Sequence, residues 1–276
     1  MIDFRNADQS ELVTVLDWAA DEGWNPGLDD AAAFFQADPE GFFVAASPKG
    51  ALVAAISVVN HSDSFAFLGL YIVRPDWRGK GIGFGLWQHA TGHAGARTIG
   101  LDGVEAQQEN YAVSGFSHAG GTTRFSGTVH GQTDPDVTLA GPAEIEKLVG
   151  KEARASGLIK TAYLEAWLTQ CETRKTLILD AGQSGSGFCT VRACREGAKI
   201  GPLVADNAQV ADRLIRHAAT LFGGPVTLDV PGSSSGLADL CRELCLVPGF
   251  RTARMYRGPG PTCGHAFYAV TSLELG

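Results

Sequence analysis

The sequence has no apolar run close to the ~20 residues that a membrane-spanning helix needs. Its first five residues, MIDFR, show no basic region followed by an apolar segment. We therefore expect no membrane partner, no secretion signal and a cytoplasmic location. Positive charge is also scarce, because the formal net charge is -8. Nucleic-acid binding depends on neutralising phosphates, so we expect a small-molecule partner and no nucleic acid.

Several chemical signatures are missing as well. None of the six cysteines forms a CxxC pair, so we expect free thiols rather than a disulfide framework. His89 and His93 are four residues apart on an expected helix, but no third ligand accompanies them, so we expect no metal. The absence of a Gly-x-Ser-x-Gly elbow argues against a serine hydrolase.

The chain has 276 residues, of which 45% are apolar and 19% charged, which suits two globular domains of about 140 residues. We predict one α/β unit in residues 1–130, a linker at 131–136 and a second unit in 138–276. In the first unit we expect helices at 8–21, 82–93 and 107–114, a short helix from Asp29, and strands at 42–46, 51–60, 65–73, 97–101 and 122–129. In the second we expect helices at 142–155, 162–171, 209–222 and 236–245, and strands at 176–180, 187–195, 198–205 and 225–230.

The two units share features at one common offset. Pro75 corresponds to Pro202, and Leu101-Asp102 corresponds to Leu228-Asp229. The order of helices and strands recurs too, which favours a duplicated α/β unit.

A glycine-rich turn, Arg78-Gly79-Lys80-Gly81-Ile82-Gly83, joins the strand at 65–73 to the helix at 82–93. Glycine lets backbone N–H groups turn inward, and the helix adds unpaired N–H groups at its positive end. With Arg78 and Lys80 at its rim, the turn is a candidate pyrophosphate site; an ordinary tight turn is the alternative. No Gly-Lys-Ser/Thr follows, so it is not a Walker motif, and the glycine spacing does not suit a dinucleotide fingerprint.

The segment from Leu70 to Gly83 resembles the acetyl-CoA motif of the GNAT superfamily, a hydrophobic strand followed by (Gln/Arg)-x-x-Gly-x-(Gly/Ala). Arg78 takes the first position, and Gly81 and Gly83 take the glycine positions. Residues 111–116, YAVSGF, resemble the family's Tyr-x-x-x-Gly-Phe element.

The resemblance covers residues 1–130, and the second half looks like the divergent copy of a tandem member. It implies an α/β fold of two GNAT-like units, 1–130 and 138–276, each a mixed, splayed β-sheet flanked by α-helices. The second half lacks the glycine turn and carries Asp206 near that position, where a carboxylate would repel phosphate. We therefore expect one cofactor site, in the first half.

The resemblance further implies transfer of an acetyl group from acetyl-CoA to a primary amine by direct attack, without a metal. Backbone groups of Ile72 and Val73 would pair with the pantetheine, and an N–H there would polarise the thioester carbonyl. Tyr111 would protonate the leaving CoA thiolate. The implied cofactor-binding residues are Ile72, Val73, Arg78, Gly79, Lys80, Gly81, Ile82, Gly83 and Asn110.

The acceptor pocket is expected near the turn that contains Trp24 and Asn25, with Asp229 of the second half as an acidic wall. The central strand has no carboxylate, so the general base stays open; the candidates are Glu22, Asp29, Asp102 and a water chain. We expect a small-molecule amine as the acceptor and a monomer or homodimer. The alternatives are acetylation of a hydroxyl or a protein lysine, and a non-catalytic acyl-CoA or metabolite sensor.

Overall fold

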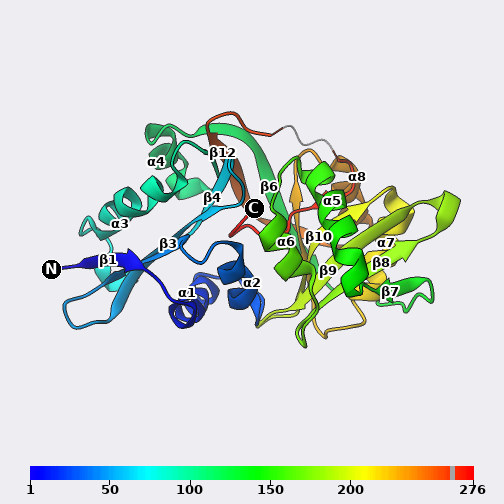
Figure 1. The fold of residues 1–276 in the computed structure, drawn as a ribbon. Coiled ribbons are helices and arrows are strands. Elements are labelled where there is room, and N and C mark those ends of the chain that lie inside the picture. The colour runs from blue at the N-terminus through cyan, green and yellow to red at the C-terminus, as the bar shows by residue number, and fades with distance from the viewer. Residues whose placement is uncertain (262–264) are drawn as a thin grey trace.

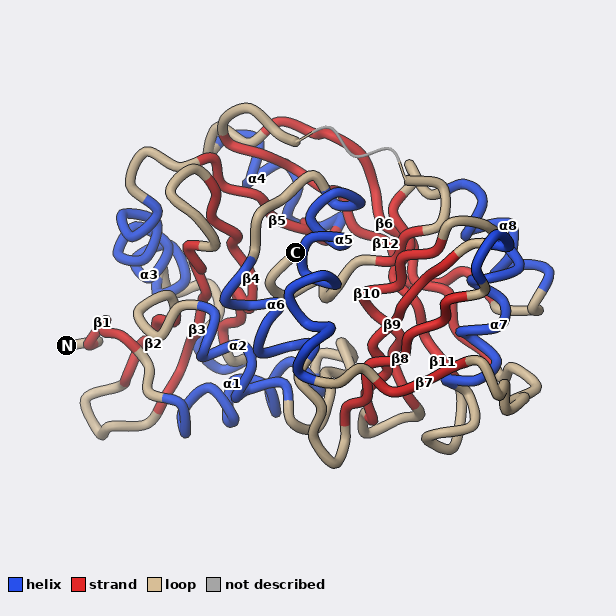
Figure 2. Tube along the Cα trace, turned by 45° about the vertical axis from the view of Figure 1, so that its right-hand side comes forward, coloured by secondary structure: helices blue, strands red, loops and turns tan. Residues whose placement is uncertain are grey.

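The structure is a computed structural model that describes residues 1–261 and 265–276. Over this described part, the strands form one 13-stranded sheet in the order β1-β2-β3-β4-β5-β12-β6-β11-β10-β9-β8-β7, with β13 beside β10 (Figures 1 and 2). The strands are β1 Asp3–Asn6, β2 Phe42–Ala46, β3 Leu52–Asn60, β4 Phe65–Val73, β5 Thr98–Val104, β6 Ser117–Gly127, β7 Val137–Leu139, β8 Arg174–Asp180, β9 Ser186–Ala193, β10 Ala198–Ala205, β11 Val226–Pro231, β12 Val247–Arg257 and β13 Tyr268–Ala269. The α-helices are α1 Gln9–Asp21, α2 Asp30–Ala37, α3 Ile82–Thr91, α4 Gln108–Val113, α5 Ile145–Ser156, α6 Thr161–Leu168, α7 Ala208–Ala218 and α8 Ser235–Glu243.

Helices cover both faces of the sheet. Successive residues of a strand point to opposite faces, so one strand contributes to two cores. On β2, Phe42 and Val44 belong to the core beneath α1 and α2, whereas Phe43 and Ala45 belong to the core beneath α3. The fold class predicted from the sequence, a mixed α/β fold with helices flanking the sheet, is confirmed.

The two halves exchange strands at the centre of the molecule. β12, from the second half, lies between β5 and β6, and β6, from the first half, lies between β12 and β11 (Figure 2). On the face of the sheet that α2 and α6 cover, the ring of Phe34 stacks on that of Trp167, with centroids 5.6 Å apart. The division into 1–130 and 138–276 stays a prediction, but the sheet runs across it without a break.

The strands of each half splay apart where a bulge interrupts the sheet. β4 and β5 pair in parallel from Phe65 with Thr98 to Leu68 with Leu101, and the pairing ends there. Two residues further along β4, Leu70 has a backbone conformation in the left-handed region, with a φ of 47°. The register between β3 and β4 shifts at the same place. The first half therefore has an open gap between two parallel strands.

The corresponding gap in the second half is filled by the chain itself. β10 and β11 pair only from Ala198–Val226 to Ile200–Leu228. Beyond that point β13 pairs with β10, Leu203 with Ala269, and the Val270 N–H donates to the Asp229 carbonyl at 3.0 Å. An extended ligand such as pantetheine would have to displace β13 to enter the gap between β10 and β11.

Five cysteines, Cys171, Cys189, Cys194, Cys241 and Cys245, are free thiols, and Cys263 lies outside the described residues. In residues 1–261 and 265–276, no helix is long and apolar enough to cross a membrane. The same residues hold no group of three or more His, Cys, Asp or Glu side chains arranged to bind a metal ion.

Candidate active site

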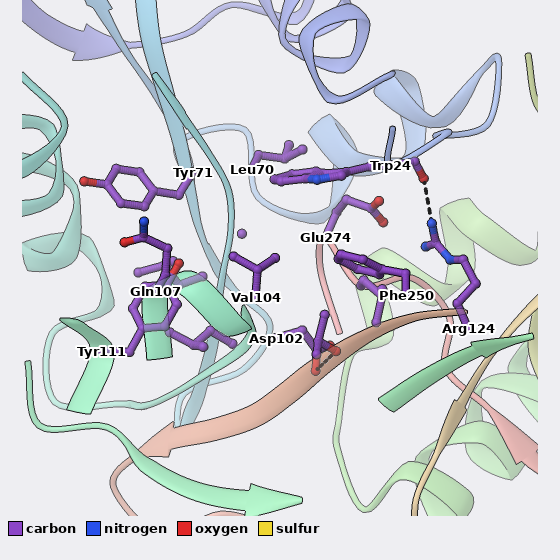
Figure 3. A pocket seen from close by; sticks show the side chains of 15 residues that line it. Trp24, Leu70, Tyr71, Asp102, Val104, Gln107, Tyr111, Arg124, Phe250 and Glu274 are labelled. Carbon is purple, nitrogen blue, oxygen red and sulfur yellow. Dashed lines mark hydrogen bonds between the residues drawn. The ribbon is translucent and has the colours of Figure 1, made fainter. Parts of the chain in front are cut away.

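Two cavities meet at the open gap between β4 and β5. We call the first the outer groove; it runs over the glycine turn and is lined by Glu22, Trp24, Tyr71, Ile72, Val73, Trp77, Arg78, Gly79, Gly81, Ile82, Gly83, Phe84, Val104, Ala106 and Gln107. We call the second the inner pocket; it is lined by Trp24, Leu68, Gly69, Leu70, Tyr71, Leu101, Asp102, Val104, Gln107, Tyr111, Arg124, Phe250, Thr252, Leu273 and Glu274 (Figure 3). Trp24, Tyr71, Val104 and Gln107 line both, so the two cavities adjoin.

The glycine turn has the backbone geometry of an anion-binding loop. Gly79 and Gly81 have φ values of 72° and 75°, and a Cβ atom built on either would meet nothing within 4 Å. The turn therefore presents bare backbone to the groove. Gly81 is the N-cap of α3, whose ten residues direct unpaired N–H groups and the positive dipole end at the same place.

The two basic residues of the turn behave differently. The Arg78 guanidinium bonds to Glu22 and donates from Nε to the Val73 carbonyl oxygen at 2.8 Å. Lys80 Nζ donates to the Asp76 carbonyl oxygen at 2.8 Å and lies 5.1 Å from the Trp77 ring centre. Arg78 lines the outer groove, whereas Lys80 is not among its lining residues. A phosphate at the turn would compete with Glu22 for Arg78.

Tyr111 lines the inner pocket and lies near Gln107, which lines both cavities (Figure 3). Its ring packs against Gly103 of β5, where an added Cβ would come within 2.9 Å of it, and stacks on Trp87 of α3 at 5.8 Å. Burial raises the pKa of Tyr111 to about 12, and Tyr71 contributes further. The phenol therefore keeps its proton throughout the neutral range, as a proton donor must. Sequence reasoning found Tyr111 but not Trp87, which orients it.

Asp102 and Asp229 are both buried in ion pairs. Asp102 accepts from Arg254 at 2.7 and 2.9 Å; burial raises the pKa of Asp102, and Arg254 only partly offsets this. Asp229 accepts from Arg124 at 2.8 and 2.9 Å. Burial favours a higher pKa for Asp229, but Arg124, together with Lys199 and Arg192, outweighs burial and the pKa is lowered. Arg124 lines the inner pocket and covers the carboxylate that was expected to form an acidic wall.

This buried pair gives a stability prediction. Asp229→Ala should lower the free energy of unfolding by about 3–5 kcal/mol, because it leaves the Arg124 guanidinium buried without its carboxylate. The control is Asp239→Ala, which removes the partner of Arg242 in a pair with exposed side chains, 71% and 59% accessible; about 0–1 kcal/mol is expected. Urea unfolding of both variants measures the difference, and equal losses would contradict this account of the pair.

The other candidate residues are held in separate places. Trp24 lines both cavities, and its carbonyl oxygen accepts from Arg124 at 3.1 Å and from Lys199 at 2.7 Å. Asn25 uses its side-chain amide on the Glu196 backbone, at 2.8 and 3.2 Å, so it joins the halves. The amide of Asn110 donates to Gln107 at 2.9 Å. The contacts of Asn25 and Asn110 with ligands stay predictions.

The three candidates for the general base lie in three different places. Asp102 lines the inner pocket but is paired with Arg254. Glu22 is at the outer groove and paired with Arg78. Asp29 accepts from the Thr173 hydroxyl at 2.6 Å and lines neither cavity. A fourth carboxylate, Glu274, lines the inner pocket. The sequence gives no sign of Glu274, because its place in the pocket depends on packing with residues far away in the chain.

Gly69 allows the segment with Glu274 to reach the site. A Cβ atom on Gly69 would lie 1.9 Å from the Glu274 carbonyl oxygen. Gly69→Ala should therefore displace this segment, lower stability by about 3 kcal/mol and abolish any activity of the site. Gly92→Ala, at a helical position with open space, should not destabilise. Thermal melts and the CoA-release assay described below check both variants; normal activity in Gly69→Ala would contradict the packing argument.

Two family models and a curated relative match this chain. Residues 10–116 match the Acetyltransferase (GNAT) family, and residues 150–266 match an Acetyltransferase (GNAT) domain. The chain is 34% identical to holothin acyltransferase of Pseudoalteromonas sp. (strain SANK 73390) over 98% of this chain and 93% of the relative.

Two solved structures have a similar fold. A putative acetyltransferase from Pyrococcus horikoshii superposes with a TM-score of 0.82 at 19% identity, covering 100% of this chain and 96% of that one. A tandem GNAT protein from the clavulanic acid biosynthesis pathway has a TM-score of 0.63 at 16% identity, covering 94% and 100%. Together with the matched motifs, these similarities show that the chain belongs to the GNAT acyltransferase family and carries two GNAT domains in tandem.

Proposed function

We propose that this GNAT acyltransferase transfers an acetyl group from acetyl-CoA to a primary amine of a small molecule, by direct attack, at the junction of the outer groove and the inner pocket. The observation that carries the proposal is the continuity of these two cavities around the end of the β4–β5 pairing. One cavity runs over an anion-binding turn, and the other is enclosed by residues of both halves.

The residues of the outer groove suit the co-substrate. The N–H groups of the turn at Gly79–Gly83 and of the start of α3 would hold the pyrophosphate. The pantetheine would lie along Ile72 and Val73, in the gap that β5 leaves open. A backbone N–H at the β4 bulge would stabilise the oxyanion that forms as the amine attacks. Arg78 would exchange Glu22 for a phosphate.

The opposite ends of the inner pocket suit the two proton transfers. Tyr111, Gln107 and Tyr71 gather on one side, and Trp24, Phe250 and Glu274 on the other (Figure 3). Tyr111 would give its proton to the CoA thiolate as the C–S bond breaks. A pocket walled by aromatic rings and containing charged groups fits a small molecule better than an extended protein segment.

We propose the acceptor as a chemical class, a primary amine, and one relative suggests a specific compound to test. A curated relative is named as an acyltransferase for holothin, so holothin belongs in an acceptor panel with primary alkyl and arylalkyl amines and their alcohols. Acetyl-CoA is to be compared with longer acyl-CoA thioesters.

The test is the release of free CoA from acetyl-CoA in the presence of each acceptor, with the acetylated product identified by mass spectrometry. Amine-dependent CoA release, with the acetyl group on nitrogen, is expected. Release only with alcohols, or only with a longer acyl-CoA, would overturn the amine or the acetyl part of the proposal. Binding of acetyl-CoA without turnover of any acceptor would favour a sensor.

A further inference from the structure

Glu274 is a buried carboxylate without a hydrogen-bond partner in the wall of the inner pocket. The residue is 3% exposed, and its Oε2 atom accepts no hydrogen bond from residues 1–261 or 265–276. No ion pair within 4.0 Å reaches it from the same residues. In the close-up, the carboxylate lies on the side of the pocket formed by Trp24 and Phe250 (Figure 3). A buried charge left in this way is costly unless a ligand pairs with it.

Several ionisable groups lie close enough to Glu274 to interact with it electrostatically. Those that act on it electrostatically are Asp102 on β5, Arg124 on β6, Arg192 on β9, Lys199 on β10 and Tyr163 on α6.

Each of the nearby cations has a different partner. Arg124 bonds to Asp229 at 2.8 Å, Arg192 lies 3.2 Å from Asp30, and Lys199 Nζ bonds to the Trp24 carbonyl oxygen. These three cations lie near Glu274 and partly offset its negative charge. None of them lies within ion-pair distance of it.

The segment that carries Glu274 is fixed at both ends. On one side, β13 fills the β10–β11 gap of the second half, and Arg192 donates to the Thr271 carbonyl oxygen at 3.2 Å. On the other, Ser272 Oγ accepts from the Leu275 N–H at 3.1 Å, and Gly69 gives the room for close approach. The closed cleft of one half thus anchors the carboxylate in the open cleft of the other.

We propose that Glu274 binds the ammonium group of the acceptor and takes the proton that the amine must lose before it attacks. This inference rests on the proposed function and assigns the base that the sequence left open. The amine nitrogen then forms the C–N bond with the thioester carbonyl carbon, and the C–S bond breaks. Of the two protons that the ammonium loses, one goes to Glu274 and then to solvent. The other restores Tyr111, whose own proton has gone to the CoA sulfur.

The walls define the class of acceptor. Trp24, Leu70 and Phe250 provide flat or apolar surface on the Glu274 side, and an ammonium beside aromatic faces gains from their quadrupoles as well as from the carboxylate. The structure therefore assigns the site to a primary ammonium carried on a compact, apolar and preferably planar body. Uncharged alcohols of the same shape should bind less well.

The experiment compares matched amine and alcohol pairs, such as 2-phenylethylamine with 2-phenylethanol and hexylamine with hexanol. Their affinities are measured by calorimetry, both for the protein alone and in the presence of saturating CoA. In wild type the amine of at least one pair should bind at least about tenfold more tightly than its alcohol. Glu274→Gln should abolish this preference, and Glu274→Asp, which keeps the charge, should retain part of it. For an acceptor that turns over, Glu274→Gln should lower kcat/KM by about 10²–10⁴-fold.

Two further measurements separate this inference from its rivals. The Tm of Glu274→Gln should equal or exceed that of wild type, because the variant removes an unpaired buried charge; a structural role predicts a lower Tm. Acetyl-CoA affinity should not change in Glu274→Gln, whereas failure of wild type to bind acetyl-CoA would refute the proposed function and leave the amine test standing. No amine preference in wild type, or the same preference in Glu274→Gln, would overturn the inference.

Discussion

Gly81→Asp is expected to weaken acetyl-CoA binding by at least about 100-fold. The substitution places a carboxylate on bare backbone that faces the outer groove, where nothing lies within 4 Å of the new Cβ atom. A like charge against a pyrophosphate costs several kcal/mol, and about 2.8 kcal/mol corresponds to a 100-fold change. Calorimetric titration with acetyl-CoA measures the effect.

Gly50→Asp is the matched control for this variant. Gly50 has a φ of 82°, close to the 75° of Gly81, and also has open space around its Cβ position, but it lies between β2 and β3, away from both cavities. Both variants should lose about 1 kcal/mol of stability from the left-handed conformation, and only Gly81→Asp should lose acetyl-CoA. Equal acetyl-CoA affinities in the two variants would show that the glycine turn is not part of the binding site.

Tyr111→Phe is expected to lower amine-dependent CoA release by about 10²–10⁴-fold, the usual contribution of a general acid. Acetyl-CoA affinity should stay within about twofold, because the ring is retained. Its stack on Trp87 and its contact with Gly103 do not involve the hydroxyl. Steady-state and single-turnover assays separate the chemical step from binding, and undiminished single-turnover rates would exclude Tyr111 as the acid.

The pH profile gives a second check on Tyr111. An acid acts in its protonated form, so the rate is lost as pH rises through its pKa. Burial raises the pKa of Tyr111 to about 12, so this loss lies above the range in which enzymes are usually assayed. Wild-type CoA release should therefore show no alkaline decline from Tyr111 between about pH 8 and pH 10. A decline in that range that disappears in Tyr111→Phe would contradict the raised pKa of Tyr111.

Local signals in the sequence predicted the first half well. The strand, glycine turn and helix around Gly81 appear in the structure as β4 and α3, because glycine in the left-handed region and a helix N-terminus leave a clear pattern. Tyr111 was singled out by its short motif, and it lines the inner pocket from α4; its role as the acid stays a prediction. Trp87 gave no such signal, because a tryptophan on an apolar helix face looks like any core residue.

Long-range pairing is what the sequence did not predict. Nothing local to residues 247–257 indicates that β12 lies between β5 and β6, because strand pairing depends on partners far away in the chain. The prediction of an acidic wall at Asp229 did not account for Arg124, which lies directly opposite Asp229 on the neighbouring strand β6. Glu274 was missed for the same reason: its position in the inner pocket depends on Gly69 and β13, not on its neighbours in the sequence.

We propose that the protein has one acetyl-CoA site, in the first half, because β13 occupies the corresponding gap of the second. Calorimetric titration of the wild-type protein with acetyl-CoA tests it most directly. The account predicts saturation at one equivalent per chain, and loss of that binding in Gly81→Asp but not in Gly50→Asp. No binding, or saturation at two equivalents, would contradict it.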